Sequence, residues 1–436
     1  MRSFLRIKKM ATDIDVQFFS HLNRLTLSNN WGDLIRLLDT CLVNGLPLTS
    51  VTSATIDAQG DITLNLYAAH NCLLLQIVEL SGFAPTEING KYRIKGMPTS
   101  TQLILKAEHV GKNITTTGAA KLASLGYDII FRDIGDIKRA YRAKNPLAEH
   151  PFIRVDESLS GEGGGAYAAS YAKYAMVGLL ENMAHIDDYA DTSKLQLPLD
   201  TTDFLKNWKI TGTSTAVKRG WSRWYWNRSS PDMTSATNDT SSQDRTTQFT
   251  LVGDADAFYF HRNLGSNTIQ SCILSGCGIF YSSLASNIIP PWFLMSIISN
   301  NSASQNAGLS NNLGGITGAQ PMTGPSYPAC NYFFIPKYDT SKRISNNNTA
   351  IGVTPDFYSG NTSFADASNL PSMEIPVLDN DRYLRGTLKH ILYSAKNQSI
   401  TTTAPVIADN SMYVGDNVIT HQSNVGGFLY YLGELE

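Results

Sequence analysis

Charged residues are scarce in this sequence of 436 residues: Asp, Glu, Lys and Arg make up 17% of it, against about 25% in an average soluble protein. The 35 basic residues are balanced by 37 acidic ones, and the formal net charge is -2. These numbers exclude disorder caused by charge excess and argue against a nucleic-acid-binding protein with a basic surface. Ser, Thr and Asn replace the missing charge, so we expect a neutral surface suited to packing against other proteins.

Cysteine and long apolar runs are also scarce. The five cysteines are too few and too scattered for a disulfide scaffold, and their odd number fits a reducing compartment. The most apolar region, 269–298, is interrupted by Asn287 and Pro290, which leaves no run of about 18 apolar residues to span a membrane as a helix. The N-terminal segment lacks the apolar run and cleavage site of a signal peptide, and translation could start at Met1 or Met10.

The patterns that are present indicate a mainly β fold. One helix is predicted over residues 30–45, with Asn30 as its N-cap and Gly45 at its end. Beyond it apolar and polar residues alternate, as in 61–69, and turns recur at roughly ten-residue spacing. We expect a small N-terminal β-sandwich or barrel module with one helix, followed by a larger β-rich domain with long polar loops.

The chain divides into three parts by composition. Residues 1–29 are expected to form an extended N-terminal arm, with Phe18 and Phe19 among its apolar anchors. Residues 30–116 hold the helix and the small antiparallel β domain, and a Thr- and Gly-rich hinge ends that part. Residues 117–436 are expected to form the larger β-rich domain with low-complexity loops, and a further division near residue 263 is left open.

Local motifs do not indicate a metal or a cofactor. The eight histidines show no metal-site spacing, and Cys272 with Cys277 lacks the second pair that a structural zinc requires, so both are interpreted as buried thiols. The glycine cluster 161-GEGGGA-166 is similar to a dinucleotide fingerprint. That fingerprint requires a helix directly after the glycines, and we favour a flexible hairpin.

Two D-x-D pairs are the remaining candidates for acid–base or calcium chemistry: Asp254 with Asp256, and Asp379 with Asp381. Neither pair continues into the spacing of an EF-hand loop, and two carboxylates in a loop more often form a solvated turn. We therefore predict that the protein is not an enzyme and has no catalytic, cofactor-binding or metal site.

The segment 218-KRGWSRWYWNRSS-230 combines aromatic and basic residues. Such residues can stack on bases and pair with phosphates, but the basic charge is local and the rest of the chain is neutral. Trp and Arg are also enriched in protein–protein interfaces, although Trp224 and Trp226 share one face of a strand that could equally face the core. The interface candidates are Phe18, Phe19, Trp221, Arg223, Trp224 and Trp226.

Several stretches resemble structural proteins of tailed bacteriophages. They are the helix 31–47, the run 69–105, the stretch 139–158 and the strand pair 249–260. In the rest of the chain beyond residue 260, only the segment 385–391 is similar to the family. The matching residues are Gly82, Pro85, Asn89, Gly90, Tyr92 and Ile94 in the second stretch, and Tyr141, Arg142, Arg154, Val155 and Asp156 in the third. These motifs describe strands and turns, so they indicate a family and not a chemistry.

The resemblance implies a structural virion protein of a phage tail, with the baseplate or distal tail as its expected place, made in the cytoplasm of the host bacterium. It implies a homo-oligomer with three-fold or six-fold symmetry that contacts other tail and baseplate proteins. The alternatives are a receptor-binding tail fibre or adhesin, a neck or connector protein, and a tail-associated hydrolase of cell wall or polysaccharide. The hydrolase would need paired carboxylates in a groove lined by Trp224 and Trp226.

Overall fold

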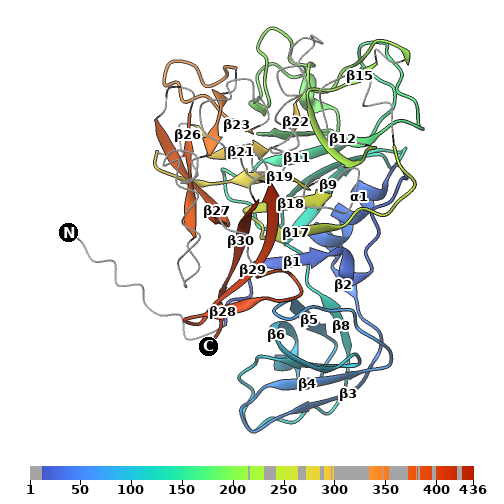
Figure 1. Ribbon diagram of the computed structural model, residues 1–436, viewed down its shortest axis with the longest axis vertical. Helices are drawn as coiled ribbons and strands as arrows, with labels where there is room; N and C mark the ends of the chain where they lie inside the picture. Colours follow the sequence, from blue (N-terminus) through green and yellow to red (C-terminus); the bar gives the residue numbers. More distant parts are fainter. Residues whose placement is uncertain are drawn as a thin grey trace, which may run out of the picture.

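The computed structural model describes residues 12–214, 217–229, 242–263, 272–284, 289–295, 297–298, 333–346, 348–352, 372–379, 381, 383–394, 399–419 and 425–436. The chain is mainly β, with 44% strand and 7% helix, and this confirms the predicted fold class. A large β-rich body lies above a smaller lobe (Figure 1).

The smaller lobe is built on one antiparallel sheet, which we call the lobe sheet. Its strands in spatial order are β2 (Leu46–Pro47), β8 (Ala119–Leu122), β5 (Ile77–Ser81), β6 (Gly90–Thr99), β7 (Gln102–Leu105), β4 (Ile62–Leu66) and β3 (Val51–Ile56). In β4 the side chains of Ile62, Leu64 and Leu66 are buried and those between them are partly exposed, as the alternation predicts. β8 lies beyond residue 116, the expected end of the small domain, and still pairs with both β5 and β2.

Three larger sheets form the body, and a short β14 (Ile210–Thr211) and β15 (Lys218–Arg219) pair lies beside them. The central sheet runs β1 (Gln17–Ser20), β17 (Phe249–Gly253), β18 (Ala257–Asn263), β19 (Cys272–Ile279), β21 (Trp292–Met295), β23 (Phe333–Ile335), β24 (Asn348–Thr349). The β12 sheet runs β22 (Ile297–Ile298), β16 (Ser222–Asn227), β12 (Lys173–Leu180), β11 (Phe152–Asp156), β10 (Lys138–Ala143), β9 (Tyr127–Arg132), with β13 (Gln196–Leu197) beside β12. The β27 sheet runs β25 (Ile351–Gly352), β26 (Met373–Leu378), β27 (Leu384–Ser394), β30 (Val425–Glu434), β29 (Ser411–Ile419), β28 (Val406–Ala408), with β20 (Tyr281–Ser282) beside β27.

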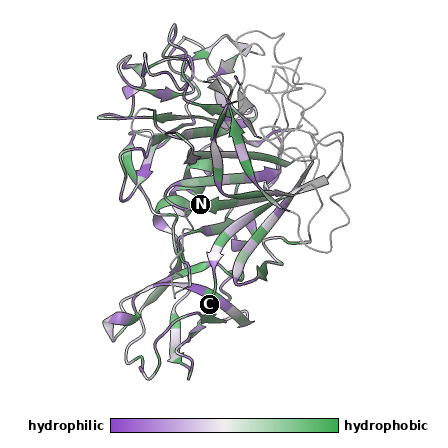
Figure 2. Cartoon of the chain, turned by 90° about the vertical axis from the view of Figure 1, so that its left-hand side faces the viewer, coloured by the Kyte–Doolittle hydropathy of each residue, from purple (hydrophilic) through white to green (hydrophobic). Residues whose placement is uncertain are grey.

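The central sheet is buried on both faces. In β21 the side chains of Trp292 and Leu294 join the core shared with the β12 sheet, whereas Phe293 and Met295 join the core shared with the β27 sheet. Because successive residues of a strand point to opposite faces, a strand between two cores needs an apolar residue at every position. Such strands form hydrophobic bands through the body (Figure 2). This is why the most apolar part of the sequence lies in the central sheet.

Part of the expected N-terminal arm is a strand of the central sheet. β1 pairs with β17, where Phe18 lies opposite Val252 and Phe19 opposite Leu251. Phe18 and Phe19 are both fully buried, one in each core. The prediction of a free arm is therefore wrong for β1, because its apolar residues alternate between the two cores. Residues 1–11 of the arm lie outside the described residues.

The predicted helix is shorter and starts later than expected. α1 spans Asp33–Leu38 and continues as a π-helical turn over Asp39–Asn44, which ends at Gly45 as predicted. The N-cap is Gly32 and not Asn30, because the buried carboxylate of Glu157 accepts hydrogen bonds from the backbone N–H groups of Gly32 and Ile35. This long-range cap cannot be seen in local sequence. Within the described part of the chain, no helix has the length and apolar character needed to cross a membrane.

Candidate functional site

The aromatic residues of β16 belong to the core. Trp224 donates its indole N–H to the backbone oxygen of Met295 at 3.1 Å, and its ring centroid lies 5.8 Å from that of Phe258. Trp226 donates to the backbone oxygen of Ser28 at 3.1 Å and is likewise fully buried. The sequence correctly placed both on one face of a strand, but that face lies against the central sheet. Neither residue offers a surface to a partner in this structure, so the interface prediction is corrected for both.

The two other candidates in this segment differ in exposure. Arg223 is buried and donates to the Tyr225 hydroxyl at 2.7 Å. Trp221 is only partly buried, with the ammonium of Lys206 4.1 Å from its ring centroid. Of the predicted interface residues, Trp221 alone keeps accessible surface, because the other side chains lie in the cores or in buried hydrogen bonds.

The turn Asp254–Asp256 between β17 and β18 is a charge cluster. Asp256 Oδ1 lies 2.7 Å from His150 Nε2, and Lys389 Nζ binds its other carboxylate oxygen. Asp254 Oδ2 lies 2.8 Å from His390 Nε2. The hydrogen bond from His150, with the charge of Lys389, holds the pKa of Asp256 well below its usual range. The interpretation of this D-x-D pair as a solvated turn is therefore wrong.

An irregularity of β27 lets two neighbouring residues reach the same turn. The register between β26 and β27 shifts between Glu374 and Pro376, opposite the stretch that contains Lys389 and His390. His390 has φ 59, a left-handed conformation that is uncommon for residues other than glycine. Consecutive residues of a regular strand point to opposite faces, and a shift in register can redirect one of them. The irregularity therefore lets both Lys389 and His390 of β27 bind the Asp254–Asp256 turn of the central sheet.

The second D-x-D pair stabilises a backbone turn, and the glycine cluster precedes a strand. Asp379 Oδ1 accepts hydrogen bonds from the backbone N–H groups of Asp381 and Tyr383, both at 3.0 Å, which closes a turn. Strand β12 follows the glycine cluster 161–166, where a dinucleotide site would need a helix. Among the described residues, no group of three or more His, Cys, Asp or Glu side chains is placed to hold a metal ion.

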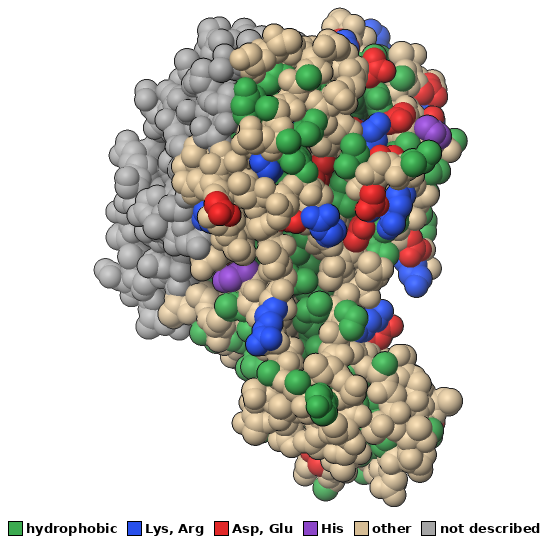
Figure 3. Space-filling model, turned by 90° about the vertical axis from the view of Figure 1, so that its right-hand side faces the viewer, with side chains coloured by type: hydrophobic (Ala, Val, Ile, Leu, Met, Phe, Trp, Pro, Cys, Tyr) green, Lys and Arg blue, Asp and Glu red, His purple; other side chains and the backbone are tan. Residues whose placement is uncertain are grey.

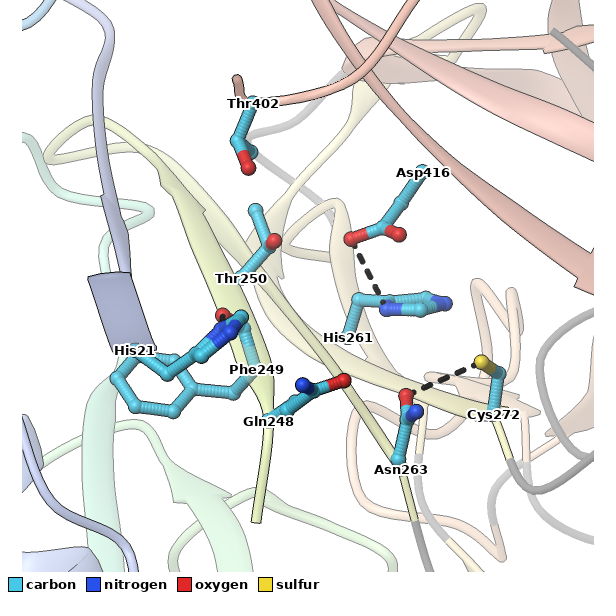
Figure 4. Close-up of a pocket in the computed structure, with 9 residues that line it drawn as sticks. All are labelled: His21, Gln248, Phe249, Thr250, His261, Asn263, Cys272, Thr402 and Asp416. Atoms are coloured by element: carbon cyan, nitrogen blue, oxygen red, sulfur yellow. Dashed lines mark hydrogen bonds and ion pairs between the residues drawn. The ribbon is translucent and has the colours of Figure 1, made fainter. Parts of the chain in front are cut away.

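A pocket of about 270 Å³ lies between the central sheet and the β27 sheet (Figure 4). Its lining residues are His21, Gln248, Phe249, Thr250, His261, Asn263, Cys272, Thr402 and Asp416. This volume is just below the range of about 300–1,000 Å³ found for sites that hold drug-sized ligands. The pocket therefore fits a small molecule and not a polymer segment.

Strand register brings three chemical groups of the pocket together. Asn263 of β18 lies directly opposite Cys272 of β19, and His261 lies opposite Leu274. Opposed residues of an antiparallel pair share a face, so His261, Asn263 and Cys272 all point toward the β27 sheet. Asp416 reaches the same place from β29, across the gap between the two sheets. A thiol, an imidazole and a carboxylate thus line one pocket.

The electrostatics of this group are dominated by one ion pair. His261 Nδ1 lies 3.1 Å from Asp416 Oδ2, and the His261 side chain is only 3% exposed. Burial alone would lower the pKa of His261, but the charge of Asp416, followed by Cys272, raises it to about 10. The pKa of the Asp416 carboxyl, whose side chain is 30% exposed, is in turn lowered by His261 against the opposing effect of burial. Near neutral pH the pocket therefore holds an imidazolium–carboxylate pair beside a thiol.

Sequence reasoning did not find this group. His261 and Cys272 were interpreted one at a time, as a surface or core histidine and as a buried thiol, and Asp416 carried no signal. The alternation of β18 and β19 could have placed His261 and Cys272 on one face, but no local pattern could have added Asp416. No protein-family model matches the sequence, and the comparison with curated proteins finds no significant match.

Proposed function

We propose that this chain is a structural virion protein of a bacteriophage tail, with the baseplate or distal tail as its place, and that it acts by protein–protein assembly. It is made in the cytoplasm of the host bacterium and assembles into a ring of identical copies that contacts other tail proteins. The resemblance described above supports this proposal, and so do three features of the molecule: rigid internal contacts, an open strand edge and one face of the lobe that has few charged side chains.

The stretches that carry the resemblance lie where strands contact the helical segment and the loops. Tyr141 of β10 donates its hydroxyl to Asp39 of the helical segment at 2.7 Å. Arg154 of β11 is fully buried, with Asp156 at 2.9 Å, Asp187 at 2.8 Å and the ring of Trp208 at 4.3 Å. Buried, fully engaged side chains of this kind fix the geometry between strands and loops. A structural subunit that holds its neighbours in fixed positions within a particle requires such rigidity.

The strand edge at β3 is the single observation that supports assembly most directly. β3 is the outermost strand of the lobe sheet, and its sequence VTSATI contains neither a charged residue nor a proline. Monomeric proteins protect such edges with charges, prolines or bulges, because unpaired backbone groups recruit further strands. Here only a register shift between Val51 and Ser53 interrupts the pairing with β4. The open edge is suited to strand addition by a neighbouring subunit.

The surface of the lobe is also suited to burial in an assembly. Figure 3 shows that the lobe has few charged side chains on this face, whereas the body above it mixes both signs. Tyr67 and Val110 of the lobe are 80% and 66% exposed. Interfaces are depleted in charge at their centre and enriched in aromatic residues. The lobe is therefore the part of the molecule that we expect to meet a neighbour.

The hydrolase alternative loses its main support, because Trp224 and Trp226 are buried and line no groove. The receptor-binding fibre and the neck protein remain rivals with the same β-rich character, and the position of the protein in the particle separates them. Immunogold electron microscopy of purified virions, with antibodies against this chain, is the direct test. We expect label at the distal end of the tail. Label at the head–tail junction or on fibres, or its absence from virions, would contradict the proposal.

A pair of substitutions tests the role of the β3 edge. Thr55 of β3 is exposed and lies opposite Thr63 of β4, so both side chains share a face and only Thr55 is on the edge. We expect Thr55→Lys to abolish assembly, measured by light scattering after size-exclusion chromatography, while the monomer stays folded. Thr63→Lys places the same charge one strand further in and should leave assembly intact. Equal behaviour of the two variants would rule out strand addition at this edge.

A further inference from the structure

Cys272 differs from the other cysteines that the structure describes. Cys41 and Cys277 are fully buried, and burial raises the pKa of each thiol well above its ordinary value. Burial also raises the pKa of Cys72 to about 12. A thiol reacts as its thiolate, so these three behave as inert apolar side chains. Cys272 is as buried as Cys72, with exposed fractions of 4% and 5%, but it lines the pocket beside polar and charged groups.

The surroundings of Cys272 favour a reactive thiol. Its Sγ donates to Asn263 Oδ1 at 3.2 Å, which orients the sulfur within the pocket (Figure 4). The ring of His261 is held by Asp416 through Nδ1, its buried Nε2 has no hydrogen-bond partner among the described residues, and Cys272 is near enough to help raise its pKa. A cation beside a thiol stabilises the thiolate. Asp416 therefore acts as a positioning residue that keeps His261 charged and aligned.

The rest of the pocket is polar enough to admit a small polar molecule. His21 enters from the segment after β1, and its Nδ1 lies 3.3 Å from the backbone oxygen of Phe249. Tyr430 of β30 is fully buried near Asp416 and Cys272, and its hydroxyl has no hydrogen-bond partner among the residues that the structure describes.

We propose that Cys272 is a modification site, a nucleophilic thiol that the pocket presents to small disulfides and that forms a mixed disulfide with them. The thiolate sulfur of Cys272 attacks one sulfur of the incoming disulfide, a new S–S bond forms, and the old S–S bond breaks. The departing thiolate takes up the proton that Cys272 released, so one thiol and one disulfide are consumed and one of each is produced. His261 stabilises both the attacking and the departing thiolate as a hydrogen-bond donor. The pocket volume of about 270 Å³ admits a small disulfide.

The test uses the full chain with Cys330→Ser, because Cys330 lies outside the described residues. The native protein is incubated at pH 7 with hydroxyethyl disulfide, a small neutral probe, and adducts are located by peptide mass mapping over time. We expect Cys272 to react at least about tenfold faster than Cys72, whose raised pKa leaves little thiolate. Reaction through global unfolding would label Cys41, Cys72, Cys272 and Cys277 at similar rates, and that result would overturn the proposal.

Variants separate activation from simple accessibility. Asp416→Asn should slow the reaction of Cys272 by about threefold or more and change its pH–rate profile, because His261 then loses the partner that keeps it charged and aligned. Thr250→Val, which removes a hydrogen bond to Asp416, is a milder variant that should act in the same direction. Asp381→Asn, in the exposed turn after β26 and outside the pocket lining, should leave rate and profile unchanged. Unchanged kinetics in both pocket variants would overturn the proposal.

Discussion

The Nδ1 atom of His261 lies 3.1 Å from the Oδ2 atom of Asp416, and this ion pair joins the central sheet to the β27 sheet. The histidine side chain is 3% exposed and the aspartate side chain 30%. The pair thus combines one buried charge with one that still reaches solvent, at the place where two sheets meet. Its protonation is therefore coupled to the stability of the sandwich that these sheets form.

We expect the contribution of His261 to the free energy of unfolding to disappear at alkaline pH. The folded pKa of about 10 lies above the ordinary 6.5, so the folded chain binds the proton more tightly than the unfolded chain. The contribution is complete below about pH 6.5 and is lost as pH rises through about 10. The difference in urea-unfolding free energy between wild type and His261→Gln should be about 2–4 kcal/mol at pH 6.5 and vanish near pH 10. His21→Gln, in the same pocket, is the control, and a difference independent of pH would contradict the prediction.

The Asp256 cluster should act at the opposite end of the pH scale. His150 and Lys389 lower the folded pKa of Asp256, so its contribution is present above the unfolded pKa of about 3.9 and is lost as pH falls below it. Asp256→Asn should cost about 1–3 kcal/mol at pH 7, measured by urea unfolding, and this cost should begin to shrink only as pH falls below about 3.9 toward the lowered folded pKa. Asp381→Asn changes the same residue type in the other D-x-D pair and should stay within about 0.5 kcal/mol of wild type. A cost of Asp256→Asn that does not decrease at all between about pH 5 and the most acid pH at which the protein stays folded would show that charge is not the cause.

Truncation of Trp221, which directly precedes β16, and of Trp224, which lies within it, should separate core from surface. Trp224→Ala removes a fully buried ring between the β12 sheet and the central sheet and should destabilise the chain by about 3–5 kcal/mol. Trp221→Ala removes a partly exposed ring and should cost no more than about 2 kcal/mol. Thermal unfolding followed by circular dichroism compares the variants. Similar losses from both would mean that Trp221 is as deeply packed as Trp224.

Arg93 of β6 should be essential to the attachment of the lobe. Its guanidinium donates to the backbone oxygens of Asp13 at 2.7 Å, Val16 at 3.0 Å and Leu432 at 2.9 Å, and so ties the lobe sheet to both terminal segments. Arg93→Lys keeps the charge but cannot reach these oxygens together, and we expect a loss of about 3 kcal/mol by urea unfolding.

Limited proteolysis should then separate the lobe from the body in the Arg93→Lys variant before the body is degraded. The reverse exchange on the same strand, at the exposed Lys91, is the matched control: Lys91→Arg should change stability by less than about 0.5 kcal/mol. Equal resistance of the two variants to proteolysis would show that Arg93 does not hold the junction.

Local patterns predicted those features that depend on neighbouring residues. The alternation of Ile62, Leu64 and Leu66 identified β4, and Gly45 identified the end of the helical segment. The start of α1 was misplaced because its cap comes from Glu157, a residue distant in the sequence. The N-terminal arm was misjudged for a related reason: only pairing with β17 turns Phe18 and Phe19 into core residues.

Composition and period-two alternation were enough to establish a β-rich chain with few charges, because strand formation and side-chain alternation are local properties of the backbone. Which sheet covers which, and therefore whether Trp224 faces solvent or a second sheet, depended on packing between distant segments. The pocket is the clearest case. His261, Cys272 and Asp416 are ordinary residues in the linear sequence, and they acquire a shared electrostatic environment only because two sheets stack and exclude water between them.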